Sequence, residues 1–159
     1  LHPWLPLLPP PGLAELYPQL RHKLAAALAA LSPEQPQLTS SALLLPWRTL
    51  LDAPSYHGLV ARHLLPKLSH ILSSELVINP SDQKLQPLLA VLSWSEPLTA
   101  EQLASLMLEH FFPPWLTTLT SWLGQAPDFG EVASWYQGWR ALLTEKAPTL
   151  LTQERVRAA

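Results

Sequence analysis

Prolines divide this chain into short segments, and that division limits the folds open to it. The 159 residues include 18 prolines but only 5 glycines. Proline lacks the backbone N–H that a helix interior or a central strand requires, so each one favours a boundary, a first helical turn or a kink. Prolines with little glycine beside them form stiff corners and not flexible linkers. We therefore expect short elements joined at fixed angles.

The apolar residues between the prolines recur at spacings of three and four residues, which is the pattern of amphipathic helices. We expect the first helix to begin between Leu13 and Tyr17, with Pro18 in its first turn, where a missing N–H costs nothing. The apolar stripe of this helix comprises Leu13, Leu16, Tyr17, Leu20, Leu24, Leu28 and Leu31. No segment shows the sustained alternation of apolar and polar residues that marks a half-buried strand. The pattern predicts an all-α fold.

Prolines also indicate where the middle helices begin or change direction. Pro66 lies inside an apolar segment from about 55 to 74 and is expected to kink or split it. Asn79 followed by Pro80 fits a helix start, with asparagine as the N-cap and proline at the first helical position. We expect the helix that begins there to be bent at Pro87.

Two capping boxes predict further helix starts, one at Thr99 with Gln102 and one at Asp128 with Glu131. Pro148 is expected to end the second of these helices, and a last short helix to follow it. In all we expect about seven helices with Pro-rich corners, arranged as an irregular superhelical, HEAT-like array. No clean internal repeat period is visible, so a true repeat protein is not established.

Proline density separates the beginning of the chain from the remainder. Residues 1–12 are expected to form a proline-rich extended arm, and residues 13–159 a helical scaffold domain. Trp4 in the arm needs a surface to lie on, and both its own domain and a partner protein are open as that surface. Because the first residue is Leu, we interpret the chain as a fragment of a longer protein.

The balance of apolar and charged residues bears on function. Hydrophobic residues make up 48% of the chain and charged residues only 14%, against about 25% charged in a typical globular domain. We expect part of this apolar surface to be buried against other proteins. The net charge of -2 and the pI of about 6.3 are untypical of a dedicated nucleic-acid-binding module.

Candidate catalytic and metal-binding groups are few. The chain has no cysteine, which excludes disulfides and thiolate metal sites. His57, His63 and His70 are spaced by six and seven residues, which suits a shared metal poorly. Neither a nucleophile elbow nor a phosphate-binding glycine loop is present, and no apolar stretch is long enough for a membrane span. We expect no enzyme, cofactor, metal, small-molecule substrate or membrane partner.

Tryptophan is the unusual residue, at 7 of 159. Trp115 and Trp122 lie two helical turns apart, and Trp135 and Trp139 lie one turn apart with Gly138 between them. A glycine inside a helix costs up to about 1 kcal/mol relative to alanine, so we expect another helix to pass close to Gly138. The spacing favours a packed aromatic core. Two alternatives stay open: one or two rings anchor a protein interface, or they stack on single-stranded RNA.

Four blocks of residues carry a further signal. Their members include Trp4, Trp47, Pro66, Asn79, Pro80, Gln83, Trp94, Phe111, Phe112, Trp115, Trp122, Trp135, Tyr136, Gly138 and Trp139. On these residues the chain resembles the C-terminal helical domain of the tuftelin-interacting protein family, also called septin-and-tuftelin-interacting proteins. That domain shares its name with the GC-rich-sequence DNA-binding-factor-like proteins. The block from Trp135 to Trp139 is the most specific, and the four blocks together cover most of the chain.

The resemblance implies a nuclear protein of mRNA splicing and mRNA processing. Family members recruit and stimulate a DEAH-box RNA helicase that disassembles the post-splicing intron-lariat spliceosome, and they stimulate it through an N-terminal glycine-rich G-patch. This chain has only 5 glycines and no such segment, so helicase activation is not carried over. The resemblance implies a protein–protein interaction scaffold that binds other spliceosomal proteins and, through the full-length protein, the helicase. The alternatives are a generic α-helical adaptor outside splicing and a weak nucleic-acid-binding domain, any direct contact with RNA being minor.

Overall fold

The part of the chain that the structure describes consists of helices, turns and connecting segments. The computed structural model describes residues 10–32 and 44–150, with the backbone alone for residues 10–15. In chain order the helices are α1 (Pro10–Ala30), α3 (Leu45–Arg48), α4 (Ala53–Leu59), the π-helix η2 (Val60–Leu64), α5 (Leu65–Ser74), α6 (Gln86–Leu92), α7 (Ala100–His110), α8 (Phe112–Leu123) and α9 (Phe129–Lys146). No strand occurs in the described ranges, and the predicted all-α fold is confirmed.

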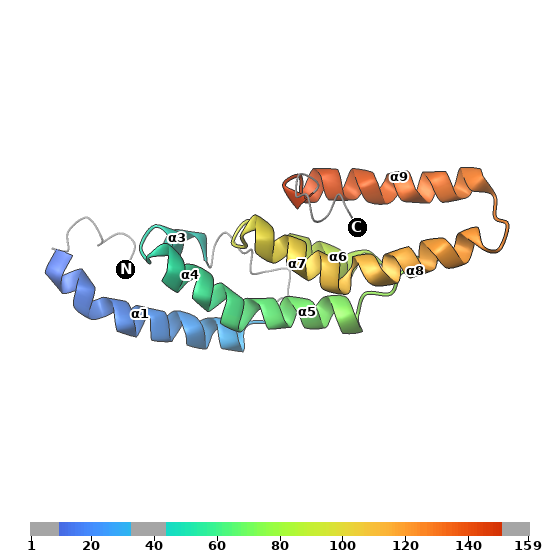
Figure 1. The fold of residues 1–159 in the computed structure, drawn as a ribbon. Coiled ribbons are helices and arrows are strands. Elements are labelled where there is room, and N and C mark those ends of the chain that lie inside the picture. The colour runs from blue at the N-terminus through green and yellow to red at the C-terminus, as the bar shows by residue number, and fades with distance from the viewer. Residues whose placement is uncertain (1–9, 33–43, 151–159) are drawn as a thin grey trace.

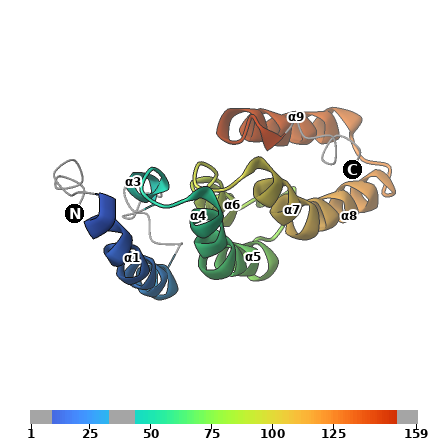
Figure 2. The ribbon, with the colours of Figure 1, turned by 60° about the vertical axis from the view of Figure 1, so that its left-hand side comes forward.

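The helices form an elongated array with α1 at one end and the α8–α9 pair at the other (Figure 1). α1 packs on α4 and η2, while α5 packs on α6 and α7. α7 leads directly into α8. α9 then turns back and runs above α8 and α7, as the view in Figure 2 also shows. A HEAT-like superhelical arrangement stays a prediction.

The hydrophobic core follows the predicted helical stripes. In the stripe predicted for the first helix, Leu20, Leu24, Leu28 and Leu31 are at most 7% exposed, which confirms that part, while Leu16 and Tyr17 are half-buried. On α5 the buried residues are Leu68, Ile71 and Leu72, and on α7 they are Leu103, Ala104, Leu106 and Met107. Most of these residues belong to one contiguous cluster that reaches as far as Leu150. Each fully buried leucine contributes roughly 1.5–3 kcal/mol relative to an exposed one.

The first helix begins earlier than its predicted start. α1 starts at Pro10, and Pro18 lies inside the helix instead of in its first turn. Pro10 and Pro11 occupy the first turn, where a missing N–H leaves no helical hydrogen bond unmade. Residues 10–12 of the expected arm therefore belong to α1, while residues 1–9 lie outside the described residues.

Pro66 divides the second long helical segment, as predicted. Because its ring nitrogen has no hydrogen, Pro66 cannot donate to the carbonyl of Arg62. The chain widens there into the π-helix η2, in which the N–H of Leu65 donates to the carbonyl of Val60, five residues back. The helix narrows again at α5, which has Pro66 in its first turn. The segment is thus split into α4, η2 and α5 without a loop.

Lys67, which follows Pro66, holds the C-terminal end of α1. Its Nζ donates hydrogen bonds to the carbonyl oxygens of Leu28, Ala29 and Leu31 at 2.8, 2.6 and 2.5 Å. The last carbonyls of a helix have no partner within the helix and carry partial negative charge, so an ammonium group is well suited to them. The side chain therefore fixes the end of α1 against α5.

The predicted helix start at Asn79 is wrong. Asn79 Oδ1 accepts a hydrogen bond from the N–H of Ser81 at 3.0 Å, which is an Asx turn and not a helix cap. Gln83 closes the turn, because its Oε1 accepts from the Asn79 N–H at 3.0 Å and its Nε2 donates to the Val77 carbonyl at 2.9 Å. The helix begins only at Gln86, so Pro87 lies in its first turn and does not bend it.

Of the two predicted capping boxes, one is present in full and the other only in part. Both hydrogen bonds of the capping box between Thr99 and Gln102 are present at the start of α7. Asp128 is the N-cap of α9 as predicted, but its Oδ1 accepts from the Gly130 N–H at 2.7 Å and not from that of Glu131. α9 ends at Lys146, before Pro148. The last short helix predicted after Pro148 falls largely on 151–159, outside the described residues.

Replacing Lys67 tests the contact that joins α1 to α5. Lys67→Met keeps the apolar stem and removes three charge-assisted hydrogen bonds, so we expect a loss of about 1–3 kcal/mol in the free energy of unfolding, measured with urea. The control is Lys23→Met, at an exposed position on α1, which we expect to change stability by less than about 0.5 kcal/mol. Equal effects of the two substitutions would contradict the role of Lys67.

Candidate interaction surface

α8 and α9 form a hairpin at one end of the array, and α8 carries no charged residue over its 12 positions, FPPWLTTLTSWL. The turn between the helices contains Ala126 with a φ of 50°, a left-handed conformation that costs a non-glycine residue about 1 kcal/mol or more. Asp128 then caps α9. An exposed helix without charges is unusual in a soluble domain, since charged side chains normally cover the solvent face.

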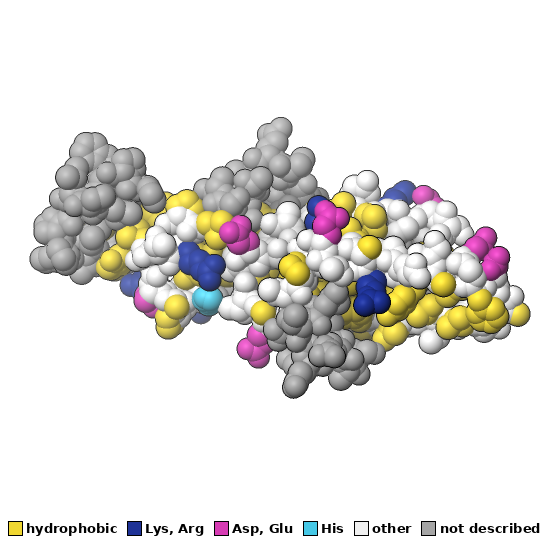
Figure 3. Space-filling view, turned by 90° about the horizontal axis from the view of Figure 1, so that it is seen from above, with side chains coloured by type: hydrophobic (Ala, Val, Ile, Leu, Met, Phe, Trp, Pro, Cys, Tyr) yellow, Lys and Arg dark blue, Asp and Glu magenta, His cyan; other side chains and the backbone are white. Residues whose placement is uncertain are grey.

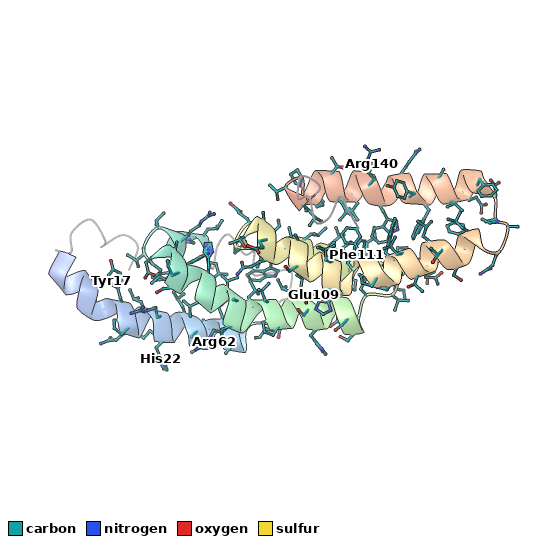
Figure 4. The ribbon with its side chains drawn as sticks, viewed as in Figure 1. Tyr17, His22, Arg62, Glu109, Phe111 and Arg140 are labelled. Carbon is teal, nitrogen blue, oxygen red and sulfur yellow. The ribbon has the colours of Figure 1, made fainter. Side chains whose placement is uncertain are left out.

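Aromatic rings fill the space between α8 and α9 (Figure 4). We call these residues the aromatic cluster: Phe111, Phe112, Trp115, Trp122, Trp135, Tyr136 and Trp139. Trp135 is at its centre. Its ring stacks on Trp115 with centroids 5.4 Å apart and an interplanar angle of 9°, and it meets Trp122 and Trp139 edge to face at 5.9 and 6.0 Å. Such pairs add about 0.5–1.5 kcal/mol each beyond the area that they bury.

The burial of these rings favours the packed-core interpretation over anchors left in solvent. Trp115 is 8% exposed and Trp139 is 5% exposed, while Trp122 and Trp135 are half-buried. The indole N–H groups of Trp115 and Trp135 are buried and have no hydrogen-bond partner in the described part of the chain. The rings are therefore held by stacking and burial.

The threonine hydroxyls of α8 donate their protons within the helix. The hydroxyls of Thr117 and Thr118 donate to the carbonyls four residues back, at 2.9 Å each, and that of Thr120 donates to the carbonyl of Leu116 at 2.8 Å. This bonding leaves oxygen lone pairs at the surface of the helix.

Apolar side chains remain exposed along the same hairpin. Leu116, Leu123, Phe129 and Tyr136 are 36%, 41%, 71% and 46% exposed. Within each helix the two residues are seven positions apart, so they lie on one side of it. Figure 3 shows hydrophobic side chains gathered along one edge of this end of the molecule. We call these four residues the exposed apolar face.

The other residues singled out in the sequence lie elsewhere or separately. Trp4 lies outside the described residues. Trp47 on α3 is partly buried against the core, and Trp94, at 1% exposure, is buried in the turn after α6. Asn79 and Gln83 close the turn before α6. The structure therefore brings together the aromatic residues between Phe111 and Trp139, and separately Asn79 with Gln83.

The expected close neighbour of Gly138 is absent. A Cβ placed on Gly138 would meet no atom within 4 Å, and the residue is exposed. The prediction of a tight helix approach at this glycine is therefore wrong. Trp135 and Trp139 face α8 from the two sides of Gly138, whereas the glycine faces away.

The described residues provide no group of three or more His, Cys, Asp or Glu side chains that could hold a metal ion. Within the same residues, none of the helices has both the length and the apolar character to span a membrane. Among the described residues, His110 has one potential ion-pair partner, Glu109, whose Oε2 lies 3.9 Å from His110 Nε2. These are findings about the described ranges alone.

Two features of the site were not predicted from the sequence. The exposed apolar face was missed, although the absence of charge from α8 was a visible signal. The polar lining of the hairpin was also missed, because Thr117, Thr118 and Glu131 become neighbours only when α9 folds back on α8.

Comparison with known proteins identifies relatives of this chain. The model of the family described as GC-rich sequence DNA-binding factor-like protein matches residues 1–119. Tuftelin-interacting protein 11 of Rattus norvegicus and that of Mus musculus are each 36% identical over 146 residues, and that of Gallus gallus is 34% identical. These alignments cover 92% of this chain but only 17% of each relative. The match to the family model ends within α8, before Trp122, Trp135 and Trp139.

Two glycines of α9 allow a matched test of the packing described here. Gly138→Ala should raise the free energy of unfolding by about 0.5–1 kcal/mol, because the position is open and alanine favours the helix. In Gly130→Ala the new Cβ would lie 3.1 Å from Asp128 Oδ1, which accepts the cap hydrogen bond. We expect Gly130→Ala to be stabilised less than Gly138→Ala, or to be destabilised. Thermal unfolding of both variants is the measurement, and destabilisation by Gly138→Ala would show that a neighbour does approach it.

Proposed function

Because this chain belongs to the GC-rich sequence DNA-binding factor-like protein family, we propose that it is a protein–protein interaction scaffold of a nuclear, splicing-related protein. The name of its relatives, tuftelin-interacting protein 11, refers to another protein with which they interact. The step that we propose is spliceosome disassembly, in which the chain binds proteins of the post-splicing intron-lariat complex. We propose no catalytic role for it.

The exposed apolar face is the observation that carries the proposal. Phe129 at 71% exposure and Tyr136 at 46% are large rings on a helix that is otherwise anchored by its buried stripe of Val132, Trp139 and Leu143. Aromatic residues that protrude from a rigid support are typical of the central contacts of protein interfaces. The aromatic cluster provides that support, since its packed rings hold α9 on α8.

The helicase is proposed as a partner of the whole protein and not of this chain alone. The chain spans 17% of the length of its curated relatives. By resemblance to the family, a DEAH-box RNA helicase would bind a G-patch in another region of the longer protein. In this proposal α8 and α9 bind spliceosomal proteins, and this binding keeps the G-patch region close to them.

Nucleic-acid binding is the weaker proposal, although the family description includes it. The chain has a net charge of -2, and α8 has no lysine or arginine. Phosphate contacts depend on such side chains, and they dominate the affinity of nucleic-acid-binding proteins. On the α8–α9 hairpin the only cations are Arg140 and Lys146, both in the second half of α9, and this low number favours a protein partner over RNA or DNA.

Removing the exposed apolar face tests the scaffold role. The double variant Leu123→Ser, Phe129→Ser leaves the net charge unchanged and replaces two exposed apolar side chains. We expect the immobilised wild-type chain to retain spliceosomal proteins from nuclear extract, and the double variant to retain at least about tenfold less. A tenfold change in affinity corresponds to about 1.4 kcal/mol, which a central aromatic contact readily supplies.

The matched control is Ala133→Ser, at another exposed position of α9, and it should retain as much as the wild type. Circular dichroism and the melting temperature should agree among the three chains. Retention of proteins from outside splicing would favour the generic adaptor. Retention that nuclease treatment abolishes, with a steep dependence on salt, would favour the nucleic-acid-binding alternative. Equal retention by the double variant would rule out the exposed apolar face as the contact.

A further inference from the structure

A groove runs between α8 and the first half of α9, bordered also by Pro80 and Ser81 of the turn before α6. Its volume is about 1120 Å³. That value lies above the range of about 300–1,000 Å³ typical of small-molecule sites. The groove is thus large enough for several residues of an extended polypeptide. It is separate from the exposed apolar face, whose four residues do not line it.

The α8 wall of the groove offers hydrogen-bond acceptors. Thr117 and Thr118 line it, and each hydroxyl already donates its one proton to a carbonyl of its own helix at 2.9 Å. A hydroxyl in that state presents only lone pairs to a ligand. The two threonines of this wall therefore suit a ligand that donates hydrogen bonds.

The α9 wall adds negative charge. Asp128 and Glu131 are the charged residues of the groove lining, and among the described residues no lysine or arginine lines it. Asp128 Oδ1 accepts from the Gly130 N–H at 2.7 Å, and its carboxylate can accept further hydrogen bonds. Two carboxylates without a cation repel a phosphate backbone and attract a positively charged group.

Two indole rings complete the lining. Trp122 and Trp135 both border the groove, and their mutual edge-to-face packing at 5.9 Å fixes their orientation. The face of an indole attracts cations more strongly than the faces of the other aromatic side chains do, and a planar guanidinium stacks on it. Arginine combines these properties, because it has five N–H donors, no acceptor, a permanent charge and a flat surface.

We propose that this groove binds an extended, arginine-bearing segment of a partner protein. An arginine guanidinium lies against the Trp122 ring and directs its N–H groups to the carboxylates of Asp128 and Glu131. The threonine oxygens of α8 accept hydrogen bonds from the backbone or from polar side chains of the same segment. The inference rests on the scaffold role proposed above and specifies a second contact for it, with a different chemistry.

Nuclear magnetic resonance of the 159-residue chain, with its indole N–H groups labelled, tests the proposal directly. The probe is a synthetic peptide of Gly, Ser and two Arg residues, blocked at both ends. Its matched controls replace both arginines by Gln or by Lys. We expect the arginine peptide to shift the indole resonances of Trp122 and Trp135 but not that of Trp94, which is 1% exposed and does not line the groove. The Lys peptide should bind more weakly, and the Gln peptide should cause no shift.

The carboxylates are tested by the double variant Asp128→Asn, Glu131→Gln, which preserves side-chain size, while asparagine remains a good helix cap. We expect it to raise the Kd of the arginine peptide at least tenfold. The control Glu75→Gln removes an exposed charge outside the groove and should leave the Kd unchanged.

Three results would overturn the proposal: no shift of Trp122 or Trp135, equal binding of the Gln peptide, or an unchanged Kd in the double variant. An eight-nucleotide uridine RNA that shifts the same indoles more strongly would assign the groove to nucleic acid instead. The scaffold role is tested separately, by which proteins the wild-type chain retains from nuclear extract. Retention without peptide binding would remove the groove proposal alone.

Discussion

The stacking of Trp135 on Trp115 is the contact on which the C-terminal end of the molecule depends. α9 buries only one stripe of residues, and Trp135 connects that stripe to Trp115 and Trp122 of α8. Indole rings are wide, so they fill the space between α8 and α9 that smaller side chains would leave empty. That arrangement leaves the exposed apolar face along the hairpin and the acceptor-lined groove between its helices. Both proposed contacts therefore depend on the same rings.

At the other end of the array, proline determines the course of the chain. Pro66 cannot complete the helical hydrogen-bond ladder, so the chain widens into η2 and starts again as α5. This restart places Lys67 where its ammonium group reaches the last carbonyls of α1. A local constraint on the backbone thus positions a long-range contact. Of the five exposed large hydrophobic residues in the described part of the chain, four lie on the C-terminal hairpin and one, Val77, lies before α6.

Local signals predicted the features that are local in origin. The leucine stripe of α1, the split at Pro66 and the capping box at Thr99 each depend on residues within one or two helical turns, and each is confirmed. Asn79 misled the prediction because an Asx turn and a helix cap use the same side-chain oxygen. Gly138 misled it because a glycine in a helix indicates a close neighbour only when it faces one. The clustering of tryptophans was visible, but which rings stack, and the groove beside them, depend on how α9 folds back, and no local pattern contains that information.

The most direct test of the central role of Trp135 is residue-by-residue amide hydrogen exchange in Trp135→Ala, compared with Trp47→Ala at the other end of the array. If Trp135 holds α9 on α8, the amides of α9 should exchange at least about tenfold faster in the first variant, which corresponds to about 1.4 kcal/mol of lost local stability. The amides of α5 and α7 should keep their protection in that variant. Unchanged exchange in α9, or an equal loss of protection throughout the chain, would contradict the account.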